Sequence, residues 1–150
     1  MVSCSSNGNS TAGVDEQTEW MLIPRYADRL EAIGEIGLVR TWQYTLHKKR
    51  PLFLDSTPRP KTRAEVKEVA TTERFDGYQN GVKSVSMMDH FYDKLLHLGV
   101  EGAIPLRNSY IAEEARHRHE VMVEFVVQFG TSGEVNEQYL SELERKLCHQ

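Results

Sequence analysis

Apolar residues recur at steps of three and four positions through most of the chain after residue 20, which is the spacing of one face of an α-helix. No segment alternates apolar and polar residues convincingly enough for a β-strand, and no internal repeat is present. The pattern therefore predicts an all-α fold of four or five helices in one domain, residues 20–148.

The first helix is predicted over residues 25–47, where one apolar stripe recurs at helical spacing. Gly34 and Gly37 lie on this stripe, although each weakens a helix by about 1 kcal/mol relative to alanine. Their position predicts close packing against another helix and not a turn. Basic residues at 48–50 favour the negative end of the helix dipole, and Pro51 ends the helix.

Three later helices are predicted at residues 84–98, from Asn108 or Ser109 to Phe129, and at about 134–147. Gly130 reads as the C-terminal cap of the longest of them. Residues 50–83 form a long connection in which 63–70 would make two helical turns. A connection of this length is uncommon in a compact domain and is often functional.

The N-terminal residues 1–19 are rich in Ser, Asn, Gly and Thr. Because they bury too little apolar surface to offset the entropy of ordering, we expect a disordered tail.

The net charge of −4 and the pI of about 5.9 give no overall basic field, so neither nucleic acid nor a membrane surface is expected as a partner. We interpret the short basic run 47–50 as a solvated helix end. Cys4 and Cys148 lie near opposite termini without metal or disulfide spacing. With no long apolar run and no signal-peptide pattern, we expect a cytoplasmic protein.

Three segments in order resemble the HD superfamily of metal-dependent phosphohydrolases, in particular an uncharacterised hydrolase subgroup. They are residues 26–40 (YADRLEAIGEIGLVR), 89–98 (DHFYDKLLHL) and 112–119 (AEEARHRH), the last leading to 122–125 (MVEF). Together the similarity spans about residues 22 to 130. It implies a partial HD-like helical bundle, corresponding to the C-terminal half of such a domain.

The resemblance also implies roles for three residues. Asp28 matches the last metal-ligand aspartate of the superfamily. His90 and Lys94, four positions apart on one predicted helix face, would bind the substrate. The cofactor would be Mn, Fe, Co or Mg, and the substrate would be a phosphate ester, with a nucleotide-like molecule as one candidate. The alternative interpretation of His90 and Lys94 is a partly buried histidine beside a lysine whose ammonium stays in water.

The family also uses a histidine and a His-Asp pair earlier in the chain. Here no histidine precedes His47 and none is followed by aspartate, so no catalytic residue is identified. One carboxylate does not hold a catalytic divalent ion at useful affinity. We therefore expect a truncated or degenerate member, inactive as a single chain, or one completed by a partner chain.

A different class of function remains open. If the front half is missing, the apolar stripe of the first helix should be partly uncovered, which favours a non-catalytic helical interaction module or a homo-oligomer.

Two further patterns are weaker candidates for a functional site. Glu114 and His117 have the Glu-x-x-His spacing of di-iron bundles, but only one copy occurs, so a solvated face with pairs such as Glu114 to Arg118 is favoured. Arg29 and Arg40 are weak candidates for substrate binding, and we expect them in salt bridges.

Overall fold

The computed structural model describes residues 19–99 and 108–149, and all regular structure in these ranges is helical. The elements are η1 (Glu19–Leu22), α1 (Ile23–Glu31), α2 (Gly34–His47), α3 (Arg63–Val69), α4 (Thr72–Gln79), α5 (Met87–Asp93), η2 (Leu95–His97), α6 (Ser109–Ser132) and α7 (Glu137–Cys148). The all-α prediction is confirmed, with more helices in this part of the chain than expected. The predicted tail lies outside the described residues, apart from Glu19 in η1.

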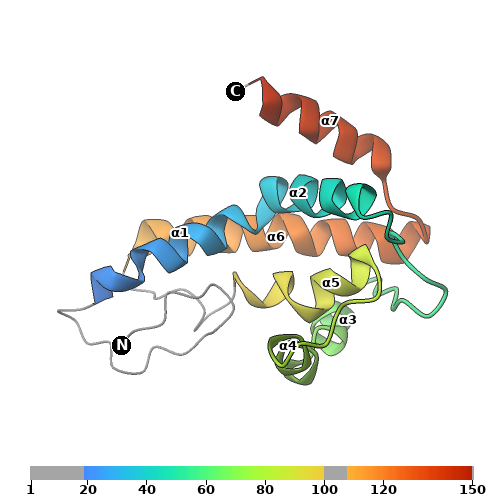
Figure 1. Ribbon diagram of the computed structural model, residues 1–150, viewed down its shortest axis with the longest axis horizontal. Coiled ribbons are helices and arrows are strands. Elements are labelled where there is room, and N and C mark those ends of the chain that lie inside the picture. Colours follow the sequence, from blue (N-terminus) through green and yellow to red (C-terminus); the bar gives the residue numbers. More distant parts are fainter. Residues whose placement is uncertain (1–18, 100–107, 150) are drawn as a thin grey trace.

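Helix α6 is the longest element, and in Figure 1 it runs between α2 and α5. Helices α1 and α2 follow each other along one side, and α7 packs on the far side of α2. Helices α5 and α3 also contact α6, while α4 packs against α5. The core between α2, α5, α6 and α7 contains fully buried Leu38, Phe91, Met122, Val126 and Leu140.

The predicted helix over residues 25–47 is broken in the structure. Ala32 ends α1, Ile33 is extended (φ −123°, ψ 169°), and Gly34 begins α2 with φ +72°. Our expectation that Gly34 is not at a turn is wrong, because this left-handed backbone strongly favours glycine. The expected close packing is confirmed: a Cβ at Gly34 would lie 2.8 Å from Cγ of Arg118 on α6.

The predicted apolar stripe is covered along α2, whereas Ala27 on α1 is exposed, so the stripe is uncovered at its N-terminal end. Ile33, Leu38 and Trp42 are buried, because α6 and α7 pack on α2. Large apolar side chains are exposed elsewhere, in η1 and at the start of α1 and of α6: Trp20, Ile23 and Tyr110 are 66%, 55% and 76% exposed.

The predicted cap at Gly130 is also wrong. Helix α6 continues to Ser132, and Gly133, with φ +79°, donates its N–H to the carbonyl of Phe129 at 2.8 Å. Gly130 has a different reason to be glycine, since a Cβ there would lie 1.8 Å from the carbonyl oxygen of Pro60. The glycine lets the segment before α3 lie directly against α6.

The connection 50–83 contains two helices, of which the sequence indicated α3. The side chain of Thr62 caps α3, and that of Thr71 caps α4, each accepting a hydrogen bond from the backbone three residues later. The predicted helix 84–98 is shorter than expected, because Ser86 caps α5 and the backbone turns at Lys94 (φ −135°, ψ −62°) before η2. No helix in the described ranges is long and apolar enough to cross a membrane.

Candidate functional site

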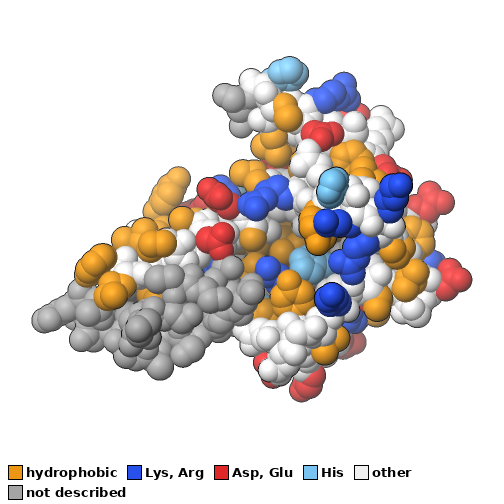
Figure 2. Space-filling view, viewed as in Figure 1, with side chains coloured by type: hydrophobic (Ala, Val, Ile, Leu, Met, Phe, Trp, Pro, Cys, Tyr) orange, Lys and Arg blue, Asp and Glu red, His pale blue; other side chains and the backbone are white. Residues whose placement is uncertain are grey.

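A cavity of about 1020 Å³ opens between α2, α5 and the segment that joins α4 to α5. Figure 2 shows Lys and Arg side chains gathered around a histidine in the middle of this face. The basic residues that line the cavity are Arg40, His47, Lys48, Arg50, Lys83, His90 and Lys94. No aspartate or glutamate is among the described residues of its lining. In a chain of net charge −4, this concentration of positive charge indicates an anion site.

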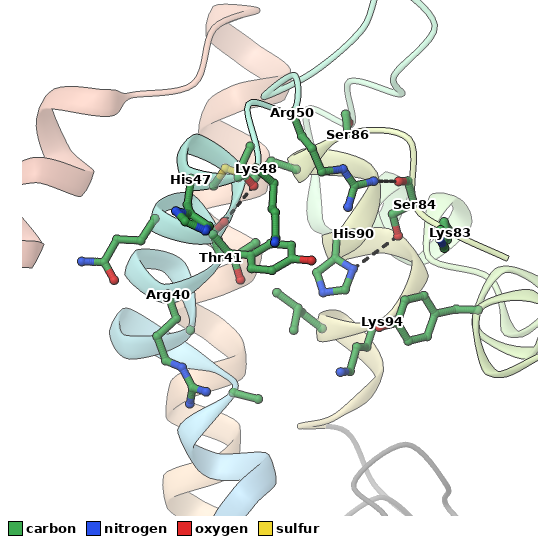
Figure 3. A pocket seen from close by; sticks show the side chains of 18 residues that line it. Arg40, Thr41, His47, Lys48, Arg50, Lys83, Ser84, Ser86, His90 and Lys94 are labelled. Atoms are coloured by element: carbon green, nitrogen blue, oxygen red, sulfur yellow. Dashed lines mark hydrogen bonds between the residues drawn. The ribbon is translucent and has the colours of Figure 1, made fainter. Parts of the chain in front are cut away.

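Helical spacing places these side chains. Arg40 and Tyr44 are four residues apart on α2 and therefore share one face, and Lys48 directly follows this helix. His90 lies on α5, and Lys94 is the residue at which the backbone leaves this helix. Figure 3 shows His90 and Lys94 extending from α5 toward α2, with Lys48 extending the opposite way. Basic side chains from the α2 side and from the α5 side therefore line the same cavity.

Arg50 fixes the position of the cavity wall, because its guanidinium donates a hydrogen bond to the carbonyl of Ser84 (Figure 3). The Ser84 hydroxyl in turn lies 3.3 Å from Nδ1 of His90. Arg40 donates to the carbonyl of Glu31 at 3.2 Å, which satisfies the end of α1. The expected salt bridge of Arg40 is thus replaced by a backbone contact.

His90 is an uncharged group in this basic cavity at neutral pH. Burial lowers its pKa to about 4, and the neighbouring cations Lys94 and Arg50 act in the same direction, against Asp93. Its ring contacts Tyr78 edge-on, with centroids 5.4 Å apart. A neutral imidazole held at Nδ1 by Ser84 can offer its other nitrogen to a ligand.

Lys94 is partly buried and pairs with no carboxylate among the described residues. Burial lowers its pKa, Asp28 opposes this, and Arg40 lowers the pKa further. Its ammonium nitrogen lies 5.4 Å from the centroid of the Tyr78 ring, a cation–π contact. The partial burial of both His90 and Lys94 is compatible with either interpretation of this pair.

Asp28 does not line the cavity but lies near its edge. It is exposed on α1, one helical turn before Ala32, which does line the cavity. Its charge is close enough to act on the Lys94 ammonium. The described residues contain no group of three His, Cys, Asp or Glu side chains that could hold a metal ion. Asp28 and its described neighbours therefore do not form a metal site by themselves.

A neighbouring stripe of α5 carries a compensated cluster of charges. Asp89 accepts hydrogen bonds from Ser86 (2.6 Å), Thr57 (2.8 Å) and Arg74 (2.9 Å), and Arg74 also binds Asp93 at 2.6 Å. Although burial opposes ionisation of Asp89, the hydrogen bonds from Ser86, Arg74 and Thr57 lower its pKa. This cluster joins α4, α5 and the segment before α3.

The Glu-x-x-His pattern on α6 has the surface arrangement that we favoured. Glu114 pairs with Arg118 at 2.7 Å, and His117 is exposed. Arg118 also donates to the carbonyl of Leu30 at 2.7 Å, so it satisfies the end of α1 beside Gly34.

The sequence identified His90 and Lys94 but missed most of the cavity. We interpreted residues 47–50 as a solvated helix end, and His47, Lys48 and Lys49 are indeed exposed there. The interpretation missed that His47, Lys48 and Arg50 also line the cavity. The four-residue spacing of Arg40, Tyr44 and Lys48 was a usable signal for the α2 wall. Lys83 has no comparable signal, because it lies in an irregular segment.

Comparisons with known proteins support the fold and leave the activity open. No protein-family model matches the chain. An uncharacterised protein of Acanthamoeba polyphaga mimivirus is 52% identical over 129 residues, covering 86% of this chain and 51% of the viral protein. A crystal structure of a protein from Lactobacillus plantarum is similar over 85% of this chain and 51% of its own, with a TM-score of 0.54 and 24% identity. The chain thus spans about half the length of both proteins and shares its fold with part of the second.

Proposed function

We propose that this protein binds a phosphate ester in the cavity between α2 and α5, as the substrate-binding part of an HD-type metal-dependent phosphohydrolase. The observation that carries the proposal is the lining of the cavity, which has five lysine and arginine side chains and no carboxylate among its described residues. Phosphoryl oxygens are strong acceptors, and charge-assisted hydrogen bonds from lysine and arginine are the usual way in which proteins hold them.

The three segments that resemble the HD superfamily support the enzymatic part of the proposal. His90 and Lys94, which the resemblance assigns to the substrate, line the cavity, and Asp28 lies close enough to act on Lys94. Asp28 would supply one carboxylate to a divalent ion, which in this family activates water. Because the described residues hold no such ion alone, hydrolysis requires ligands from a partner chain or from outside the described ranges.

The first experiment separates binding from hydrolysis. Binding of inorganic pyrophosphate is measured by calorimetry for the wild type and for a variant with Lys48→Ala and Lys83→Ala, two exposed cavity residues. We expect the affinity to fall by about tenfold or more, because each exposed charge contributes up to about 1 kcal/mol. Lys67→Ala, an exposed lysine on α3 outside the cavity, is the control. Equal affinity in all three proteins would refute the cavity as the anion site.

The second experiment tests the metal. Phosphatase activity is screened with Mn²⁺, Co²⁺, Mg²⁺ and Fe²⁺ for the wild type and for Asp28→Ala. Turnover that depends on metal and is lost in the variant would support the HD assignment. If Asp28→Ala leaves metal binding and turnover unchanged, Asp28 is not a ligand.

A second candidate function is a helical interaction module. It is favoured by the exposed Trp20 in η1, Ile23 at the start of α1 and Tyr110 at the start of α6. Sedimentation of the wild type and of Trp20→Ser with Tyr110→Ser tests whether these side chains support self-association. A wild type that stays monomeric at high concentration would count against a homo-oligomer formed through them.

A further inference from the structure

We propose that Lys94 is a carbonyl-reactive amine, and that the cavity captures small phosphorylated aldehydes by forming an imine at its Nζ atom. The inference rests on the proposed phosphate binding and adds a covalent step at one named atom. It follows from the position of Lys94 relative to the other cations of the cavity.

Lys94 differs from the other two lysines that line the cavity. Lys48 and Lys83 are exposed, whereas Lys94 is partly buried at the end of α5, where the backbone turns. Its nitrogen lies over the Tyr78 ring at 5.4 Å, and no described carboxylate lies within salt-bridge distance. Burial inside the cavity disfavours the ammonium, and this lowers the pKa of Lys94 although the contact with the Tyr78 ring favours the charged form.

The groups around Lys94 agree with this assignment. Arg40 on α2 disfavours the ammonium, Asp28 on α1 favours it, and burial outweighs Asp28, so the pKa of Lys94 is lowered. His90, one turn earlier on α5, is neutral at physiological pH, so the positive charge of the cavity comes from its lysine and arginine side chains. Tyr78 supplies the apolar wall.

The rest of the lining supplies the selectivity for a phosphorylated molecule. Lys48, Arg50 and Lys83 also line the cavity and are available to the phosphoryl group. A cavity of about 1020 Å³ is large enough for a phosphorylated aldehyde of drug-like size. Holding the phosphoryl group there raises the effective concentration of the carbonyl group near Lys94.

The chemical step needs no co-reactant. The lone pair of Nζ adds to the carbonyl carbon, the π electrons of the C=O bond move to oxygen, and the nitrogen loses a proton while the oxygen gains one. The resulting carbinolamine loses water as the C=N bond forms. Carbonyl and amine thus give imine and water, with no change of oxidation state.

The test uses pyridoxal 5′-phosphate as the probe. The full chain is incubated with the probe, the imine is reduced with borohydride, and the modified lysines are located by peptide mass spectrometry. We expect Lys94 to be modified about tenfold or more above Lys48, Lys83 and Lys67 at low probe concentration, the range in which proximity dominates. Pyridoxal without phosphate should show no such preference, and inorganic pyrophosphate should protect Lys94.

A conservative variant separates chemistry from binding. Lys94→Arg retains the positive charge but forms no stable imine, so we expect loss of the imine absorbance with pyrophosphate affinity kept within about twofold. Lys83→Arg, a substitution of the same kind in the same cavity, should retain the imine. Imine formation undiminished in Lys94→Arg would overturn the inference.

The outcomes distinguish this inference from the proposed function. Even modification of all cavity lysines, with protection by pyrophosphate, would overturn the reactive role of Lys94 and leave the anion site standing. Equal modification by pyridoxal, without protection by pyrophosphate, would overturn both. Selective, phosphate-dependent and protected modification of Lys94 would support both.

Discussion

Two neighbouring stripes of helix α5 carry polar and charged side chains. In one stripe the charges form ion pairs within the protein, and in the other they do not. Asp89 and Asp93, four residues apart, are bound by Arg74, and Asp89 is further held by Ser86 and Thr57. His90 and Lys94, also four residues apart, face a cavity whose other charged groups are cations. Two neighbouring stripes of one short helix thus have opposite electrostatic arrangements.

The difference indicates which charges serve stability and which serve a ligand. A buried carboxylate with three donors is satisfied within the protein and needs nothing further. Cations gathered without a counter-charge repel one another, and their mutual repulsion is relieved when an anion binds. Perturbed groups in a cleft are candidates for function on this ground, whereas those in a compensated cluster are not.

Removing the carboxylate of Asp89 should have the largest effect. Asp89→Ala is expected to lower the free energy of unfolding by about 4 kcal/mol, because Arg74, Ser86 and Thr57 lose their common acceptor in a poorly solvated place. Urea denaturation measures the change. Asp76→Ala, at an exposed acid on α4, is the control and should change stability by no more than about 0.5 kcal/mol.

Lowering the pH should reduce the free energy of unfolding through His90, which faces the cavity. Its pKa of about 4 in the folded protein lies below the ordinary 6.5, so the unfolded chain binds the proton first as the pH falls. The neutral histidine therefore contributes stability above pH 6.5 that is lost between pH 6.5 and 4, up to about 3 kcal/mol.

The measurement for His90 is the stability of the wild type and of His90→Gln across this pH range. The variant lacks the titrating group and should lose less stability than the wild type. Parallel curves would show that His90 is not held in the neutral form. His97 and His119, whose pKa values are also lowered by burial, remain in both proteins and cancel in the difference.

Lys94 should affect binding more than folding. Lys94→Met keeps the length of the side chain and removes the charge. We expect the affinity for pyrophosphate to fall by about tenfold, or 1.4 kcal/mol, with the free energy of unfolding unchanged or raised by about 0.5 kcal/mol. A loss of stability as large as that of Asp89→Ala would contradict the conclusion that Lys94 contributes to binding and Asp89 to stability.

The smallest expected effect is that of salt, which should change pyrophosphate affinity but not the contribution of Asp89 to stability. Raising the ionic strength from about 0.05 to 0.5 M should weaken pyrophosphate binding several-fold, because the exposed cavity cations are screened. The stability difference between wild type and Asp89→Ala should change by less than about 0.5 kcal/mol, since Asp89 is buried. Equal salt dependence of both quantities would contradict the assignment.

The helical pattern predicted the elements whose apolar faces are regular. The α6 start at Asn108 or Ser109 is confirmed, because an Asn side chain caps the helix there. Gly34 was misread because the chain turns there with φ +72°, although its close packing was predicted, and Gly130 was misread because its role depends on a distant partner. Arg118 approaches one and the carbonyl of Pro60 the other, and neither contact is visible in local spacing.

The cavity was predictable only in part. The pair His90 and Lys94 followed from a resemblance and from the four-residue spacing. The remaining wall depends on how α2 faces α5 and on Arg50 binding the carbonyl of Ser84, across more than thirty residues of sequence. Such long-range placement follows from tertiary packing, which a single sequence does not display.

The break at Gly34 has a consequence for hydrogen exchange. Helix α1 is anchored mainly by a small separate cluster, in which Leu22 and Tyr26 contact Ala115, whereas α2 belongs to the main core. Segments with few apolar contacts open locally at a lower free energy than the core. The amides of α1 should therefore exchange sooner than those of α2, and Asp28 would leave the edge of the cavity with α1 while the basic walls stay folded.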